Sequence, residues 1–438
     1  MATHAVSDTE LEKALFSDDP EYNAMFDVSQ QGINAGSEHN HDYTDDLNAV
    51  AAKGGVQEGS MRSHLRLPGG SFESMGTDKV FTFYSYRANE IGWRENTLFS
   101  SEGYNKMGVF QMIGPTILSM VGKQHKRLRA TAQPLFKRPR VLGWWNERFV
   151  QDTVDVLLNR IAKSGDTRTD IDQNLCAPLP MAVITRAIGL EGKSVIDFRF
   201  HLHRGTFGST DTPIEDRLAS FKYVDETLTE LVEKNLRDPG DNVITSLMDN
   251  ELTEDDGSKR RLTKEELFGF CKLVIFAGGG TTWRQLGITI HALLSHYDFW
   301  EACREDRTLI EQAVDESLRW RATDPVFPRL CVADTEVEGV FIPANSQVQL
   351  CLGTANHDPA VFENPTQYDI FRKKEHHMGF GFGPHRCLGM DVAKQEMVLA
   401  INGLMDRFPN MRLDPDMPAP VFGGLEHRGM TSLPVVLK

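Results

Sequence analysis

Hydrophobic and polar positions predict one long helix in the second half of the chain. Thr263 and Glu266 have the spacing of a capping box, in which each side chain caps the other residue's backbone N–H, and residues 267–276 are mostly apolar. This run leads into residues 278–280, which are all glycine. Each glycine in a helix interior costs roughly 1 kcal/mol relative to alanine, so we expect another group to need the space of the missing side chains.

Two further patterns predict a second helix and a pair of strands. Apolar residues recur at helical spacing within residues 309–318, which places Glu316 and Arg319 on one helix face. Such a pair is commonly solvated; if buried, it needs further partners, which Arg372 and backbone carbonyls could supply. Residues 339–357 alternate between apolar and polar around a Pro-Ala-Asn-Ser turn, which indicates a strand, a turn and a strand.

Composition indicates a globular protein with one large folded unit. The chain is 40% hydrophobic and 25% charged, which is ordinary for such proteins. No Pro/Gly/Ser-rich linker or internal repeat divides the 438 residues, so we expect a flexible polar arm over residues 1–20 and a single domain over residues 21–438. With 47 basic and 62 acidic residues the net charge is −15, which argues against nucleic acid as a partner.

The N-terminus and the cysteines favour a cytoplasmic protein. The acidic, polar N-terminus has no signal-peptide pattern, and the longest uncharged run, residues 339–357, contains Pro343 and several amides, so it is not a membrane span. The six cysteines form no CxxC pair. This fits reduced thiols and excludes the usual zinc arrangements and a covalently attached c-type haem.

Glycines crowd the segment before another helix-like run, which begins near Leu388. They stand at positions 379, 381, 383 and 389, together with Pro384, around Cys387. Glycine lets a flat ligand approach the backbone, and a helix N-terminus stabilises a thiolate. The loop therefore indicates a segment that presents one sulfur, although a glycine-rich turn with an incidental cysteine has the same composition.

The segment from Phe380 to Gly389 resembles the haem-binding loop of the cytochrome P450 monooxygenases. Its sequence, FGFGPHRCLG, carries every fixed residue of the family motif FxxGxxxCxG. The resemblance covers about residues 100–438 and implies a cytochrome P450 fold, mainly α-helical with a smaller β region. In that fold a long central helix crosses the haem b, and the cysteine loop lies on the opposite, proximal side.

Further motifs of the family follow in the right order. They are the HxxxR pair His125 and Arg129, the oxygen-binding stretch 277–282, the ExxR pair Glu316 and Arg319, and Arg372 as the third member of that ion-pair network. By resemblance, Cys387 is the axial thiolate ligand of the haem iron, Phe380 shields the sulfur, and cationic side chains neutralise the haem propionates. The cofactor contacts that the resemblance implies are His125, Arg129, Ala277, Gly278, Arg329, Phe380, Gly381, His385, Cys387 and Gly389.

On the other side of the haem, the resemblance assigns the catalytic positions to Gly280, Thr281 and Thr282. Thr281 would pass protons to the oxygen, and a local break in the helix would free carbonyls to hold water. The usual form of the motif has an acid directly before the two threonines, where this chain has Gly280. We expect ordered water or a polar group of the substrate to fill that gap.

A basic stretch suggests how electrons arrive. Seven basic residues and no acid lie between positions 123 and 140. In the family this region lies on the cysteine side, where an acidic ferredoxin docks and passes on electrons from NAD(P)H; charge complementarity speeds such association. A solvated basic face would have the same composition. The docking residues that we expect are Lys123, Lys126, Lys137, Arg138 and Arg140.

The resemblance implies a monooxygenase that inserts one oxygen atom from O2 into an apolar small molecule. Residues 198–221 fall where the family places a substrate-contacting segment. The apolar pocket wall is expected from Phe270, Val274, Val326 and Phe327. Two alternatives stay open: a peroxide-driven peroxygenase of the same fold, and a haem-thiolate protein that senses ligands or transfers electrons without turnover. Thr281 argues against both, since such peroxygenases typically lack it and a non-catalytic protein has no use for it.

Overall fold

The computed structural model describes residues 8–29, 41–69, 75–77, 79–206 and 212–438. Its α-helices are α1 (Asp8–Leu15), α2 (Pro20–Met25), α4 (Thr44–Ala51), α5 (Met61–His64), α6 (Tyr86–Arg94), α7 (Gly108–Ile113), α8 (Gly122–Ala132), α9 (Arg138–Arg140), α10 (Gln151–Lys163), α11 (Pro178–Ala187), α12 (Lys193–Thr206), α13 (Ile214–Arg237), α14 (Val243–Asp249), α15 (Lys264–Ser295), α16 (Tyr297–Glu305), α17 (Leu309–Trp320), α18 (Leu352–Ala355) and α19 (Met390–Arg407). Shorter 3-10 turns span Ser101–Lys106, Gln133–Phe136 and Gly383–His385, and π-helical stretches span Val141–Val150 and Asp172–Cys176.

The strands are fewer and shorter than the helices. They are β1 (Val56–Glu58), β2 (Val80–Phe83), β3 (Phe99–Ser100), β4 (Arg168–Asp170), β5 (Glu251–Thr253), β6 (Lys259–Arg261), β7 (Phe327–Cys331), β8 (Thr335–Val337), β9 (Val340–Ile342), β10 (Gln347–Leu350), β11 (Arg412–Leu413), β12 (Phe422–Gly423), β13 (Gly429–Met430) and β14 (Pro434–Val436). The largest sheet has the order β1-β2-β10-β7-β3, in which β2 and β10 run parallel and the other neighbours antiparallel. The two strands predicted within residues 339–357 are β9 and β10, but β9 pairs with β8 instead of β10.

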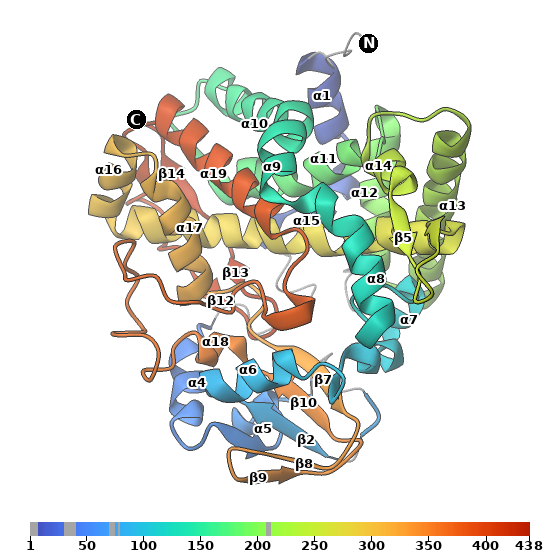
Figure 1. The fold of residues 1–438 in the computed structure, drawn as a ribbon. Helices are drawn as coiled ribbons and strands as arrows, with labels where there is room; N and C mark the ends of the chain where they lie inside the picture. Colours follow the sequence, from blue (N-terminus) through green and yellow to red (C-terminus); the bar gives the residue numbers. More distant parts are fainter. Residues whose placement is uncertain (1–7, 30–40, 70–74, 78, 207–211) are drawn as a thin grey trace.

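The long helix α15 crosses the middle of the molecule (Figure 1). The larger helical part, with α10, α11 and α19, lies on one side of it, and the five-stranded sheet with α4, α6 and α18 lies on the other. The predicted mainly α-helical fold with a smaller β region is therefore confirmed. Among the described residues, no helix is both long and apolar enough to cross a membrane.

The capping box predicted at the start of α15 is present. Thr263 N–H donates to Glu266 Oε2 at 2.8 Å, and Glu266 N–H donates to Thr263 Oγ1 at 3.2 Å. The helix then continues without interruption to Ser295, so the expected local break at the glycines is wrong. Two of the three glycines have a packing role, because α15 lies against α11.

Contacts with α11 explain Gly278 and Gly279. A Cβ on Gly278 would stand 2.1 Å from Ile184 Cδ1, and one on Gly279 would stand 2.1 Å from Met181 Cε. Both distances are far below van der Waals contact, so any larger residue would displace these side chains from a closely packed interior. The space that these two glycines leave is therefore filled by the protein itself.

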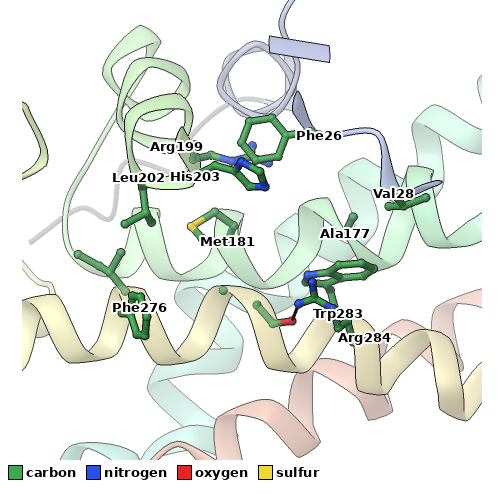
Figure 2. A pocket seen from close by; sticks show the side chains of 13 residues that line it. Phe26, Val28, Ala177, Met181, Arg199, Leu202, His203, Phe276, Trp283 and Arg284 are labelled. Atoms are coloured by element: carbon green, nitrogen blue, oxygen red, sulfur yellow. Dashed lines mark hydrogen bonds between the residues drawn. The ribbon is translucent and has the colours of Figure 1, made fainter. Parts of the chain in front are cut away.

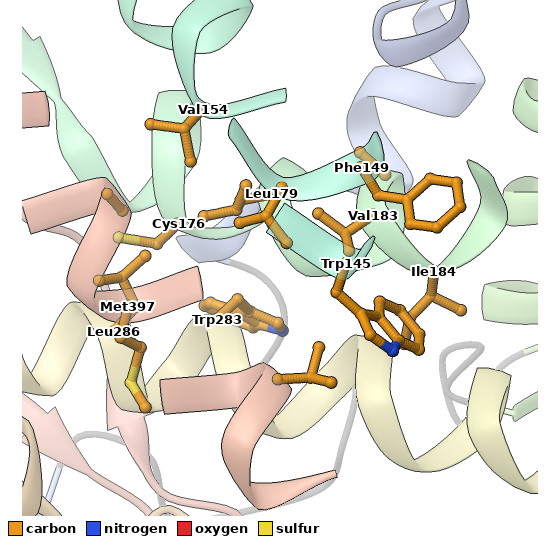
Figure 3. Close-up of a cluster of buried hydrophobic side chains, with 14 of the residues drawn as sticks. Trp145, Phe149, Val154, Cys176, Leu179, Val183, Ile184, Trp283, Leu286 and Met397 are labelled. Atoms are coloured by element: carbon orange, nitrogen blue, oxygen red, sulfur yellow. The ribbon is translucent and has the colours of Figure 1, made fainter. Parts of the chain in front are cut away.

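The main hydrophobic core lies among α10, α11, α15 and α19 (Figure 3). Trp145 is 1% exposed, and its indole N–H donates to the Leu135 carbonyl at 2.9 Å, which satisfies its only polar atom. Edge-to-face contact with Phe149, at 5.8 Å between ring centroids, continues the packing.

The N-terminal segment is part of this core. Leu11 and Leu15 of α1 are 3% and 2% exposed and belong to the same cluster. From Asp8 onward the expected flexible polar arm is therefore wrong, because Leu11, Ala14 and Leu15 have the spacing of an amphipathic helix that buries one face. Residues 1–7 of the expected arm lie outside the described residues.

Candidate active site

Backbone contacts fix the loop that carries Cys387. The Cys387 N–H donates to the Phe380 carbonyl at 2.8 Å, and Gly381 and Gly383 have φ angles of 68° and 64°. A Cβ on Gly383 would stand 2.8 Å from the Trp93 carbonyl oxygen of α6. Glycine is needed at this point both for the left-handed backbone and for the close approach. The loop is held against α6, and α19 begins three residues after the cysteine.

Cys387 differs from the other cysteines in its exposure. The remaining five are buried, whereas the Cys387 side chain is exposed. The Cys387 side chain is open to solvent yet surrounded by protein on several sides. This partial burial raises the pKa of the thiol, whereas the Gly389 N–H, Arg129 and Arg386 act to lower it. A thiol in such a place loses its proton when it coordinates a metal cation.

Arg329, on β7, is a buried cation near this loop. Its side chain is 1% exposed, its guanidinium lies 4.5 Å from the Trp93 ring, and desolvation lowers its pKa. Nη1 donates to the Pro328 carbonyl at 2.7 Å and lies 3.5 Å from the Tyr104 hydroxyl, while Nε has no partner among the described residues. A buried, incompletely bonded guanidinium is costly unless an anion reaches it.

Three more basic side chains gather at the Cys387 loop. The His125 and His385 rings stack with centroids 4.1 Å apart, and desolvation lowers their pKa values to about 4 and about 2. His125 Nε2 has no described hydrogen-bond partner. Arg129 donates to the Arg386 carbonyl. Within the described part of the chain, no acidic side chain forms an ion pair with His125, Arg129, Arg329 or His385.

These residues fit a haem. Its two propionates are anions, and they would supply the partners that Arg329 and His125 lack, with guanidinium groups giving two-point geometry. Cys387 is exposed and able to serve as a sulfur ligand. Apart from Gly389 itself and its neighbours along the chain, no described atom lies within 4 Å of where a Cβ on Gly389 would be, so the loop also leaves open space near the cysteine.

Glu316, Arg319 and Arg372 form one buried network, brought together by α17 and the segment after α18. Arg372 Nε donates to Glu316 Oε1 at 3.1 Å, and the Asp369 N–H donates to the same oxygen at 3.1 Å. Arg319 also donates to the carbonyls of Asn356, Pro365 and Gln367. The partners that a buried pair needs are those anticipated from the sequence: a second arginine and backbone carbonyls.

The two threonines of α15 have different surroundings. Thr281 is half-buried and its Oγ1 donates to the Ala277 carbonyl at 3.1 Å, and Ala277 is exposed. Thr282 is only 6% exposed and lies in the packed interior. Thr281 is therefore the threonine with access to open space. The Gly280 carbonyl accepts a hydrogen bond from Arg284 Nη1 at 2.9 Å.

The four expected pocket residues are divided among three packing clusters. Phe270 is 3% exposed and belongs to the main core, and Val274 is partly buried and packs against that core. Val326 belongs to a separate cluster, and Phe327 packs edge-on against Trp93 at 5.4 Å. Aromatic and branched residues at helical spacing usually belong to the hydrophobic core, and Phe270 does so here.

A cavity of about 60 Å³ lies elsewhere along α15 (Figure 2). Its lining includes Arg199 and His203 of α12, and Phe276, Gly280 and Arg284 of α15. The sequence reasoning placed α12 within a substrate-contacting segment but singled out none of its residues. Two basic residues four apart, at 199 and 203, were the available signal, since that spacing puts both on one helix face.

The expected docking residues are exposed but not equally available. Lys123, Lys126, Lys137, Arg138 and Arg140 are all exposed. Arg138 forms a two-point ion pair with Glu311, at 2.6 and 3.0 Å, and the Arg140 guanidinium lies 4.3 Å from the Trp144 ring. Among the described residues, Lys126 and Lys137 form no ion pair. These two lysines are therefore the least committed charges of the stretch.

The chain is similar to known proteins of one family. A family model described as cytochrome P450 matches residues 199–423. Cytochrome P450 107B1 of Saccharopolyspora erythraea is 34% identical over 74% of this chain and 77% of its own length. Steroid C26-monooxygenase of Mycobacterium tuberculosis is 30% identical over 80% of this chain and 93% of its own length.

The fold is also similar to that of solved structures. Substrate-free CYP109E1 from Bacillus megaterium has a TM-score of 0.79 and 22% sequence identity, over 91% of this chain and 99% of that chain. The family implies a haem cofactor and O2 as co-substrate. The chain therefore belongs to the cytochrome P450 family and is an oxidoreductase that incorporates oxygen.

Proposed function

We propose that this protein inserts one oxygen atom from O2 into an apolar small organic substrate, with electrons from NAD(P)H through a separate ferredoxin-type donor. The observation that carries the proposal is an exposed Cys387 beside four basic side chains, of which Arg329 and His125 are buried without a described acidic partner. The steroid C26-monooxygenase relative is named for an apolar substrate class, which supports the substrate proposed here.

The residues around Cys387 would hold the haem. Haem with a thiolate ligand supplies the activation of O2, because electron donation from sulfur favours O–O cleavage. Cys387 Sγ would be that ligand, and Phe380 would cover the sulfur. Arg129, Arg329 and the two stacked histidines would bind the propionates, with Gly381 and Gly389 giving the ring close access to the loop.

Thr281 is proposed to hold and pass a proton at Oγ1. Its hydroxyl donates to the Ala277 carbonyl, which leaves the oxygen lone pairs free to accept a hydrogen bond from a donor in the open space. Ala277, which is exposed, would face the oxygen-binding side, whereas a side chain at Gly278 would point toward Ile184 of α11. Gly280 has no carboxyl group that could supply this proton. The proton must therefore come from a group other than residues 280–282.

Electron delivery is proposed at the exposed basic stretch. Lys123, Lys126, Lys137, Arg138 and Arg140 would attract the acidic surface of a ferredoxin, which raises the rate of encounter. The cytoplasmic location expected from the sequence stays a prediction.

Isotope labelling under two electron supplies tests this function. The haem-loaded protein is incubated with candidate apolar substrates under 18O2, with NADPH, a ferredoxin and its reductase, and in parallel with hydrogen peroxide alone. Products that carry one 18O atom in the reductant-dependent reaction support the monooxygenase. Turnover with peroxide alone would instead favour a peroxygenase, and binding without product in either reaction would favour a non-catalytic protein.

A further inference from the structure

A cavity lies where α11, α12 and the segment after α2 meet α15 (Figure 2). Its volume is about 60 Å³, and roughly 10–15 Å³ of such space holds one water. The cavity is therefore large enough for a small organic ion. Gly280, which stands where the family motif has an acid, contributes to its lining.

Arg199 points a buried positive charge into this cavity from α12. Its side chain is 4% exposed. Nη1 donates to the Leu15 carbonyl at 3.0 Å, but Nε has no partner among the described residues. The guanidinium lies 5.3 Å from the Phe26 ring, whose cation–π attraction offsets only part of the lost hydration.

Arg284 brings a second charge to the same cavity from α15. Its guanidinium lies 4.5 Å from the Trp283 ring, and its Nη1 donates to the Gly280 carbonyl. Desolvation lowers its pKa, opposed by Asp324 and Asp172. The cavity thus has two guanidinium groups, and each is left with donors beyond its backbone contact.

Described acids act on Arg284 without pairing with it, since Asp324 and Asp172 only oppose the shift of its pKa. Neither Arg199 nor Arg284 forms an ion pair among the residues that the structure describes. Asp324 contacts His427 at 2.9 Å. Burial raises the pKa of Asp172 well above its ordinary value, which disfavours its charged form. The pKa of His203 is lowered to about 4, mainly by burial and further by the charges of Arg284 and Arg199. This imidazole is therefore neutral at pH 7.

The remaining lining is apolar and sets the size and nature of the ligand. Its side chains are Phe26, Val28, Met181, Leu202, Phe276 and Trp283. Two guanidinium groups match the planar oxygens of a carboxylate. A phosphate would bring a larger and more hydrated charge into a small apolar space, which is costly to desolvate.

We infer that this cavity is a carboxylate-binding site, in which Arg199 and Arg284 hold an external carboxylate in place of the acidic side chain absent at Gly280. The carboxylate belongs either to a free small acid or to the substrate. This inference concerns binding and does not depend on the proposed oxygen chemistry.

Calorimetry on the haem-loaded protein tests the site with sodium propionate as the probe. Propionamide, which has the same shape without the charge, is the control ligand. Propionate should bind and propionamide should not. Arg199→Gln should weaken propionate binding at least about tenfold, as expected for loss of a charge-assisted contact. Arg204→Gln on the same helix, which removes a pair with Asp216 instead, should leave binding unchanged.

A second variant adds the carboxylate to the chain itself. Gly280→Glu should raise the melting temperature above that of Gly280→Gln and should abolish propionate binding, because its own carboxylate occupies the site. Equal binding of propionate and propionamide, no effect of Arg199→Gln, or no difference between the two Gly280 variants would each overturn the inference.

The haem spectrum separates the two sources of the carboxylate. If the substrate supplies it, octanoate should shift the haem spin state more than octanol, and Arg199→Gln should remove the difference. If a free acid supplies it, propionate should bind without a spectral change and octanoate should behave like octanol. Both readouts are independent of product formation, so a failure of the monooxygenase proposal would be seen separately.

Discussion

Glu316 and Arg319 share two hydrogen bonds in the interior of the protein: Arg319 Nε donates to Glu316 Oε2 at 2.8 Å, and Nη2 donates to Oε1 at 2.7 Å. Their side chains are 7% and 2% exposed. Removing Glu316 leaves the buried charge of Arg319 without its carboxylate, and removing Arg319 leaves the buried Glu316 with a single arginine partner, Arg372, among the described residues.

Replacing Arg319 should therefore be strongly destabilising. We predict that Arg319→Met lowers the free energy of unfolding by about 3–5 kcal/mol, measured by urea denaturation. Arg138→Met is the matched control, because its two-point pair with Glu311 is exposed, at 52% and 40% of the side chains, and should contribute about 1 kcal/mol or less. Similar losses in both variants would contradict the buried network as a stabilising feature.

The glycines of α15 give a prediction that separates packing from catalysis. Gly278→Ala should destabilise the protein by about 1–3 kcal/mol through overpacking, because its Cβ would meet Ile184 Cδ1 at 2.1 Å. Ile184→Val removes that methyl group, so the double variant should recover much of the loss in a thermal denaturation cycle. Additive losses in the double variant would mean that Gly278 is needed for another reason.

Glu396 predicts how stability depends on pH. Its side chain is 2% exposed, Oε2 has no described partner, and burial raises its pKa from 4.5 to about 8. Between these values the folded protein keeps a proton that the unfolded chain has released. The contribution of this group is therefore fully present below about pH 4.5 and is lost as the pH rises toward 8, by up to about 1.4 kcal/mol per pH unit.

Glu396→Gln should remove this dependence. Urea unfolding from pH 5 to pH 8 should show the wild type losing stability relative to the variant as the pH rises. Glu305→Gln, at an exposed position of α16, should run parallel to the wild type. Parallel curves for all three proteins would show that Glu396 does not titrate in this range.

The basic stretch predicts a salt-dependent reduction rate. Lys126→Glu with Lys137→Glu should slow reduction by a ferredoxin about tenfold at low ionic strength, and the difference should shrink near 1 M salt, where charges are screened within about 3 Å. Arg138 is a poorer choice, because its replacement also breaks the pair with Glu311. Stopped-flow reduction at several salt concentrations measures this; equal rates for wild type and variant at all of them would exclude docking there.

Local patterns predicted much of the fold and of the proximal site. The capping box, the ExxR helix and the glycine-rich loop each depend on residues close in sequence, so spacing identified Thr263, and the resemblance to the cytochrome P450 motifs singled out Glu316 and Cys387. The resemblance also named Arg372 as a partner of Glu316, although the two are 56 residues apart in sequence.

Features set by packing between distant segments were not predictable in the same way. The sequence could not show that α11 fills the space at Gly278 and Gly279, because Ile184 and Met181 come from another helix. It also gave no reason to place Arg199 and Arg284 on one cavity, since only the fold brings their helices, α12 and α15, to it. The pairing of β9 with β8 instead of β10 likewise depends on which strands the fold places side by side.

The most direct test of the account is the optical spectrum of the reduced, haem-loaded protein with carbon monoxide. Wild type and Cys331→Ser, which alters a buried cysteine that donates to the Ala333 carbonyl, should show the same strongly red-shifted Soret band. Cys387→Ser should lose it. A histidine-like band in the wild type, or a red-shifted band that survives in Cys387→Ser, would contradict thiolate ligation by Cys387 and with it the proposed monooxygenase.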